Sequence, residues 1–234
     1  MRKYRTCQAG PRCSLLFVLS CLGLITLAEQ KSLPAIDPGP VVKVEEDWSL
    51  EIISPAYDET SPQITNTISP VPNLNGRFGV FELNHGTQPD YNDGGLELQI
   101  WDHNDRISYR RHGNTNRLSY CDEIVKYTLV MSLKTPDDGS RRLQFDIKNG
   151  ASQTWGVFGD NDNLRCYAWT SLENLDAYSP TFSVENSKVG YASFRVRKYA
   201  LVAVRYYDAN GLIRTDSTER VAFEYRANAV ISEP

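Results

Sequence analysis

The sequence predicts an all-β domain, a two-sheet antiparallel β-sandwich of the jelly-roll type preceded by an N-terminal signal segment. Apolar and polar residues alternate with a period of two in segment after segment. Asn-Gly and Asp-Gly pairs stand between these segments, and such pairs suit hairpin turns. After residue 28, no segment has a convincing helical period of 3.6.

The clearest alternation runs from residue 42 to residue 52. Its apolar residues share one parity, which only Glu46 interrupts, and charged or polar residues fill the other parity. Because successive strand side chains point to opposite faces, this segment is predicted to be a strand, or two end to end, with one wet face. The same alternation predicts strands at 96–100, 125–133, 143–147 and 221–225.

Other segments carry weaker signals. The apolar residues of 78–83 switch parity midway, which predicts either a bulge or a strand buried on both faces. Hairpin turns are predicted at 137–139, 149–150 and 210–211. The spacing of Leu172, Leu175 and Tyr178 allows one or two helical turns at most.

The N-terminus has the pattern of an export signal. Basic residues in 1–5 precede an apolar run at 14–28, which is shorter than the about 20 residues of a membrane-spanning helix. We expect cleavage after Ala28 and an extracellular, periplasmic or cell-surface location. The alternative is an uncleaved signal anchor, which would then be the protein's only membrane contact. The predicted division is 1–28 signal peptide, 29–40 proline-rich tether and 41–230 β-sandwich domain.

Charge argues against one class of partner. The chain has a formal charge of −4, but four of its 25 basic residues lie in residues 1–28, which hold no acid. The remainder therefore carries −8. Since binding to phosphate backbones depends on Lys and Arg, nucleic acid is not an expected partner.

Cysteine usage leaves two alternatives. Cys7, Cys13 and Cys21 would leave with the signal, so the mature chain keeps Cys121 and Cys166. Export permits a disulfide between them. Both can equally be buried free thiols, because unpaired cysteine behaves as a small apolar residue.

Two stretches carry a resemblance. The opening at 41–48, followed by Thr67-Ile68-Ser69-Pro70, is similar to that of a group of uncharacterised exported bacterial proteins. So is the C-terminal half, through 155–159, Ser179-Pro180 and 189–196. Such chains look like the concanavalin A/laminin G type of jelly roll, which serves sugar binding, adhesion and some glycoside hydrolases. The resemblance implies the fold and leaves the activity open.

Catalytic residues are not expected. Glycoside hydrolysis needs two carboxylates about 5–9 Å apart, and jelly-roll hydrolases commonly present them as Glu-x-Asp-x-Glu on one strand. No such run occurs, and Glu97 with Gln99 is interpreted as an ordinary wet face. His85, His103 and His112 are interpreted as solvated turn residues rather than bases or metal ligands.

No cofactor is expected, with one reservation. Asp160 and Asp162 lie in an Asp-Asn-Asp-Asn run, and clustered oxygen donors are what Ca²⁺ prefers. The run lacks the closing glutamate of a calcium loop, and Asp/Asn clusters also build turns. Plain turns are favoured, with calcium as the alternative.

Two features are candidates for binding a partner. Arg106, Arg110, Arg111 and Arg117 gather in an otherwise acidic domain, in a stretch expected to be a loop that pairs with nearby acids, namely Asp102, Asp105, Asp122 or Glu123. Guanidinium groups suit carboxylate or sulfate, so the candidate partner is a polysaccharide or another cell-surface component. Tyr167 and Trp169 share one face, where the rings can stack on sugars; burial in the core is favoured.

These residues favour a non-enzymatic exported domain that binds a glycan or a cell-surface component. The alternatives are a structural envelope-associated protein without a small-molecule site and, third, a glycoside hydrolase.

Overall fold

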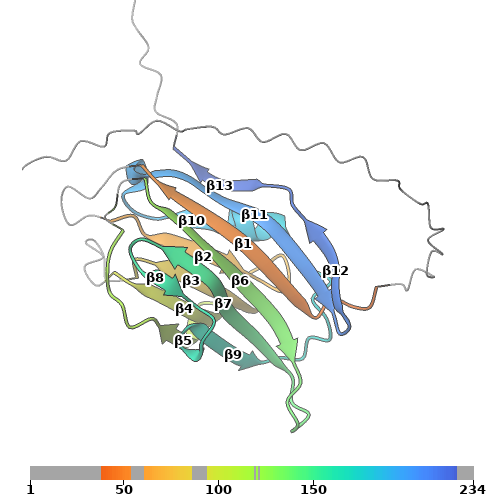
Figure 1. Cartoon of the computed structure of the whole chain (residues 1–234). Coiled ribbons are helices and arrows are strands. Elements are labelled where there is room, and N and C mark those ends of the chain that lie inside the picture. The colour runs from red at the N-terminus through yellow and green to blue at the C-terminus, as the bar shows by residue number, and fades with distance from the viewer. Residues whose placement is uncertain (1–37, 54–60, 86–93, 119, 121, 226–234) are drawn as a thin grey trace, which may run out of the picture. The chain divides into compact units, whose positions relative to one another are not determined.

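The computed structural model describes residues 38–53, 61–85, 94–118, 120 and 122–225 of the 234-residue chain. The described residues form two antiparallel sheets packed face to face (Figure 1). The predicted all-β sandwich is therefore confirmed. The proposed signal segment and most of the proposed tether lie outside the described residues.

The larger sheet has the strand order β12-β11-β1-β6-β7-β8, with β13 beside β11 and β9 beside β7. Its central strand β1 pairs with β11 on one side and with β6 on the other (Figure 1). Its strands are β1 (Lys43–Ile52), β6 (Ile124–Lys134), β7 (Arg142–Ser152), β8 (Gly156–Phe158), β9 (Arg165–Trp169), β11 (Val196–Asp208), β12 (Gly211–Asp216) and β13 (Arg220–Glu224).

The smaller sheet has the order β10-β2-β3-β4-β5, so β5 is an edge strand. Its strands are β10 (Lys188–Val189), β2 (Ile64–Ile68), β3 (Arg77–Leu83), β4 (Leu96–Asp102) and β5 (Asp105–Arg111). The helical elements are short: α1 (Pro180–Glu185) and the 3-10 helices η1 (Asp162–Leu164) and η2 (Ser193–Arg195). Within the described residues, no helix is both long and apolar enough to cross a membrane.

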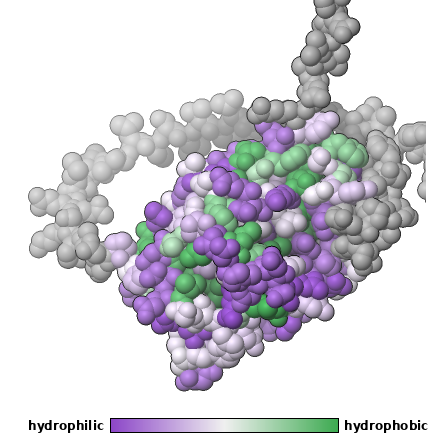
Figure 2. All heavy atoms as spheres, turned by 180° about the vertical axis from the view of Figure 1, so that it is seen from behind, coloured by the Kyte–Doolittle hydropathy of each residue, from purple (hydrophilic) through white to green (hydrophobic). Residues whose placement is uncertain are grey.

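The core lies between the two sheets and is rich in aromatic rings. Trp48 of β1 stacks on Tyr199 of β11 with ring centroids 4.8 Å apart. Phe81 of β3 meets Tyr127 of β6 edge-on at 5.0 Å, which links the two sheets directly. The face of the molecule opposite to Figure 1 is mostly hydrophilic, with apolar residues scattered between polar ones (Figure 2).

Several local predictions are settled by the strand register. The apolar residues of β3 are buried on both faces, and β3 pairs with β2 and β4 without a shift, so the second alternative for 78–83 holds. The hairpin predicted at Asn149-Gly150 is wrong, because both residues lie inside β7. Asn149 has φ 52° and lies where the register between β6 and β7 shifts. The two residues therefore belong to a β-bulge in β7.

The helical prediction is also corrected. Residues 172–178 are not helical, and the six-residue helix α1 begins after them. Ser179 caps it, since its hydroxyl accepts a hydrogen bond from the Phe182 amide at 3.3 Å, and Pro180 occupies the first turn.

Candidate functional site

The outer face of β4 carries a buried carboxylate. Leu96, Leu98 and Ile100 point into the core, which turns Glu97 and Gln99 to the other face of the sheet. That face was expected to be wet, and the expectation is wrong. Glu97 is 0% exposed and Gln99 is 2% exposed, because side chains from β3 and β5 close over them.

Two arginines of β5 hold the Glu97 carboxylate. Arg106 Nη1 donates to Oε1 at 2.8 Å, and Arg111 Nε donates to Oε2. Positions five apart on a regular strand face opposite ways, but a register shift between Ile100 and Trp101 aligns Arg106 with Trp101. The bulge therefore brings both guanidinium groups to the face of Glu97.

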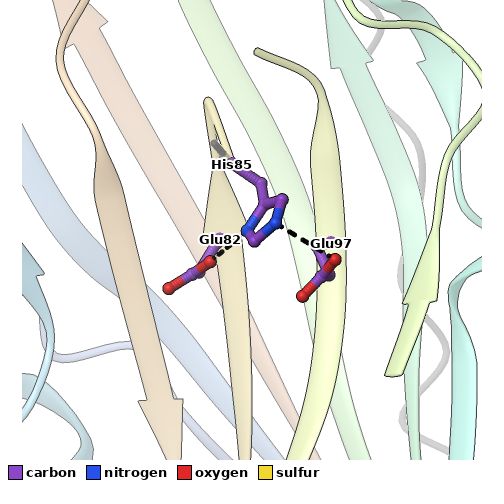
Figure 3. Close-up of side chains that lie close together, drawn as sticks. All are labelled: Glu82, His85 and Glu97. Atoms are coloured by element: carbon purple, nitrogen blue, oxygen red, sulfur yellow. Dashed lines mark hydrogen bonds and ion pairs between the residues drawn. The ribbon is translucent and has the colours of Figure 1, made fainter. Parts of the chain in front are cut away.

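His85 lies beside the same carboxylate (Figure 3). Asn84 has φ 59° and turns the chain after β3, so that His85 Nδ1 reaches Glu82 Oε2 at 2.6 Å. Arg111 Nη2 lies 2.6 Å from His85 Nε2. Glu97 Oε2 lies 3.3 Å from the same Nε2, so this nitrogen lies between a guanidinium and a carboxylate.

A cavity of about 370 Å³ opens next to this cluster. Among the described residues that line it, none is acidic; they are His85, Gly94, Gly95, Leu96, Arg111, His112, Thr115 and Arg117. We call it the basic cavity. Its wall has room for glycine only at two positions, Gly94 and Gly95, which have φ 63° and 83°. A Cβ on Gly94 would lie 2.5 Å from the Thr115 carbonyl oxygen, and one on Gly95 would lie 2.8 Å from that of Asn114.

Glu82, His85 and Glu97 place three ligand-type atoms within 4.8 Å of one another, a set that metal ions use. Their charges are already balanced, since Arg106 and Arg111 lie on Glu97. Gln99 Nε2 also donates to Glu82 at 3.0 Å and to Glu97 at 2.8 Å. A divalent metal ion would have to displace these donors and bind beside two guanidinium groups. The geometry therefore favours ion pairs between the carboxylates and the arginines over a metal site.

The same contacts argue against glycoside hydrolysis here. Glu82 and Glu97 are register partners on adjacent strands, so they do face each other. They are bridged by Gln99 instead of being separated by an open cleft. A fully buried carboxylate held by two arginines is closed to a substrate, so it serves neither as acid nor as nucleophile.

The structure brings the four predicted arginines together in part: Arg106, Arg110 and Arg111 line one open cavity, and Arg117 lies with Arg111 at the basic cavity. Arg106, Arg110 and Arg111 lie on strand β5, not in the expected loop. Arg106 and Arg111 share Glu97, Arg111 and Arg117 share the basic cavity, and Arg110 Nη1 instead donates to the Tyr109 carbonyl at 3.0 Å.

Three of the four acids expected to pair with these arginines have other partners in the structure. Asp102 bonds Arg77, Asp122 bonds Arg197, and Glu123 accepts two hydrogen bonds from Thr154. Sequence reasoning missed Glu82, and its interpretation of His85 as a solvated turn residue is wrong, since that side chain is only 16% exposed and lies against Glu82 and Glu97. These contacts depend on strand register. The pairing with Glu97 therefore corrects the prediction.

The aromatic pair on β9 is on the surface. Tyr167 and Trp169 are 50% and 51% exposed, whereas Leu164, Cys166 and Ala168 of the opposite parity are buried. The predicted parity is confirmed, and the favoured burial of the two rings is wrong. Trp48 and Trp155, by contrast, are buried in the core.

The two aspartates of the predicted calcium run have partners within the protein. Asp160 accepts the Asn149 amide at 2.8 Å, and Asp162 pairs with Arg165, so calcium binding there stays a prediction. Cys121 lies outside the described residues, so its pairing also stays a prediction. Cys166 is a buried thiol that donates to the Leu98 carbonyl at 3.4 Å, and burial raises its pKa to about 11.

A second cavity, of about 510 Å³, lies on the outer face of the larger sheet. Its charges alternate in sign and pair with each other, as in Lys198 with Glu219 at 2.7 Å and Arg205 with Asp47. It therefore has no net preference for a charged ligand, in contrast to the basic cavity.

Comparisons with known proteins add little to this geometry. Neither protein-family models nor curated protein sequences match the chain. Among solved structures, it is similar to a mutant of the alginate lyase Aly36B in complex with an alginate trisaccharide. The alignment covers 61% of this chain and 66% of the lyase chain, at 12% identity and a TM-score of 0.26. A similarity of this size identifies neither a family nor an activity.

Proposed function

We propose that this β-sandwich is an exported, non-enzymatic module that binds an anionic saccharide in the basic cavity. The observation that carries the proposal is the lining itself. Arg111, Arg117, His85 and His112 face one concave space, and no described lining residue is acidic. The volume of about 370 Å³ falls within the range of small-ligand sites.

Charge selects the class of ligand. Residues 29–234 carry −8, so the protein as a whole repels polyanions and a local basic cavity stands out. Guanidinium groups bind carboxylate or sulfate through parallel hydrogen bonds. Glu97 anchors one of them, since Arg111 Nε is held on a fully buried carboxylate. Ordering that side chain before binding lowers the entropy cost of binding.

A competing interpretation concerns the edge strand. Charged side chains on an exposed edge prevent edge-to-edge association, and β5 carries three arginines. That role explains Arg106 and Arg110 as well as binding does. It does not explain why Arg117, outside the strand, joins Arg111 at the same cavity.

The test is calorimetric titration with oligogalacturonate, dextran sulfate and uncharged dextran at about 20 mM and 150 mM salt. We expect one of the two anionic polymers to bind, and binding to weaken with salt. The Arg111→Gln, Arg117→Gln double variant should bind about tenfold more weakly or worse. Carboxylate and sulfate ligands are distinguished by which polymer binds.

The matched control is the Arg197→Gln, Arg220→Gln double variant, which also removes two guanidinium charges, from surface ion pairs with Asp122 and Asp216. It should bind as wild type does. Equal binding by the Arg111→Gln, Arg117→Gln double variant, or no anionic polymer bound at low salt, overturns the proposal and favours the structural envelope protein. Size-exclusion chromatography of Arg110→Gln tests edge protection separately, because loss of that role gives higher oligomers.

Export belongs to the same proposal and rests on the apolar run at 14–28. We expect a mature N-terminus at Glu29. N-terminal sequencing of secreted protein checks this, and recovery of the intact chain in the membrane fraction contradicts it.

A further inference from the structure

A second surface lies on the outer face of the larger sheet, at β9. Tyr167 and Trp169 are two residues apart on the same face, and each ring is half exposed. The Arg142 guanidinium lies 4.9 Å from the Tyr167 ring centroid and 4.6 Å from that of Trp169. One cation thus contacts both rings and fixes their orientation, which leaves a rigid aromatic surface toward solvent.

Trp169 also forms part of the wall of a separate cavity of about 340 Å³. Arg77 and Asp102, the first residue of β3 and the last residue of β4, line the same cavity. Arg77 Nε donates to Asp102 Oδ2 at 3.1 Å, and each side chain is about one-third exposed. The cavity therefore combines one aromatic ring with a donor and an acceptor in contact with water. We call it the Trp169 cavity.

This combination matches the chemistry of a sugar ring. The C–H face of a pyranose is apolar and stacks on an aromatic ring, while its hydroxyls both donate and accept hydrogen bonds. Arg77 supplies N–H donors, and the Asp102 carboxylate supplies acceptors. The hydrogen bonds from His103 and, to a smaller extent, Arg77 lower the pKa of Asp102, so the group stays an acceptor at neutral pH.

The charge balance excludes the ligand proposed for the basic cavity. Asp102 neutralises Arg77, and its carboxylate repels an approaching anion. We propose that the Trp169 cavity is a second saccharide site, which binds an uncharged pyranose by stacking on Trp169 and hydrogen bonding to Arg77 and Asp102. The inference goes beyond the proposed function and does not depend on the basic cavity.

The test is titration with three uncharged chains, cellohexaose, mannohexaose and laminarihexaose, followed by calorimetry and saturation-transfer NMR. We expect at least one to bind with a dissociation constant of about 1 mM or tighter. Because no net charge is involved, affinity should be the same at about 20 mM and 150 mM salt. That insensitivity separates this site from the basic cavity.

Three variants locate the binding. Trp169→Ala should lose at least about tenfold in affinity, and Asp102→Asn should lose a smaller factor. Phe194→Ala is the matched control, because Phe194 is also a half-exposed ring, 57% exposed. It should bind as wild type, as should the Arg111→Gln, Arg117→Gln double variant. No binding of any of the three chains, or unchanged binding by Trp169→Ala, overturns the inference, whatever the anionic polymers do.

Discussion

Trp48 donates its indole N–H to Glu46 Oε2 at 2.8 Å, from two residues further along the same strand. Both side chains point into the core, where Tyr178 donates its hydroxyl to Glu46 Oε1 at 2.6 Å. Glu46 is the charged residue that interrupts the apolar parity of β1 in the sequence. A carboxyl group thus lies in the middle of the sandwich, satisfied by two donors but removed from water. Burial raises its pKa to about 7.

This raised pKa predicts how stability depends on pH. Between about pH 4.5 and pH 7 the folded state holds a proton that the unfolded state releases, so the free energy of unfolding falls as pH rises. The loss amounts to about 3 kcal/mol and is complete above pH 7. Glu46→Gln removes this dependence. The free energy of unfolding of Glu46→Gln, relative to that of wild type, should therefore rise by about 3 kcal/mol from pH 4.5 to pH 8, as measured by urea unfolding.

The control is Glu219→Gln, in which an exposed carboxylate paired with Lys198 is neutralised. The free energy of unfolding of Glu219→Gln, relative to that of wild type, should not rise between pH 4.5 and pH 8. A constant difference between Glu46→Gln and wild type at every pH would show that Glu46 titrates normally.

Close packing between the sheets predicts a second effect. A Cβ on Gly79 of β3 would lie 2.6 Å from Cδ1 of Phe145, a fully buried ring of β7. Gly79→Ala should therefore destabilise the protein by about 1–3 kcal/mol through overpacking. Gly113→Ala, where a Cβ meets nothing within 4 Å, should be nearly neutral. Equal midpoints of urea unfolding for the two variants would contradict the packing argument.

Much of the fold follows from alternation, and the exceptions have one cause. β1, β4, β6 and β7 each bury one parity in the core, which leaves a periodic signal in the sequence. β5 buries almost none of its residues, so its pattern resembles a loop and it was predicted as one. An edge strand that is wet on both faces leaves no period of two to detect.

The site shows the same limit at the level of register. Glu97 has the sequence signature of a wet face, and only strand pairing brings it opposite Arg111. The bulge between Ile100 and Trp101 then adds Arg106 to the same face, although a spacing of five predicts the opposite one. The arginines were visible as a cluster from composition. Their shared partner was not, because register across three strands has no local signal.

Burial of Cys166 predicts slow chemistry at this thiol. Its Sγ donates a hydrogen bond to the Leu98 carbonyl between the sheets. Burial raises the pKa of the thiol to about 11, so little thiolate forms at neutral pH. After reduction, native protein should react with a bulky maleimide at Cys166 far more slowly than urea-unfolded protein does. Peptide mass mapping resolves this residue from the other cysteines. Similar rates in the two states would contradict the buried position.

The last prediction separates preorganisation from net charge in the basic cavity. Glu97→Gln makes the protein less acidic, so long-range attraction alone predicts tighter binding of an anionic saccharide. The structure predicts the reverse. Arg106 and Arg111 both form ion pairs with the Glu97 carboxylate. Without that negative charge, nothing of equal strength holds their guanidinium groups in place. Binding should weaken about tenfold.

Asp105→Asn is the matched control, because it removes the same charge from an exposed residue at the start of the same strand. It should leave binding unchanged or strengthen it slightly. Calorimetric titration of both variants with the anionic polymer that wild type binds, at about 20 mM salt, gives the comparison while screening is weak. Circular dichroism confirms first that both variants are folded at the temperature used. If Glu97→Gln binds as tightly as Asp105→Asn, or more tightly, the buried carboxylate does not position the arginines and attraction in the cavity depends on charge alone.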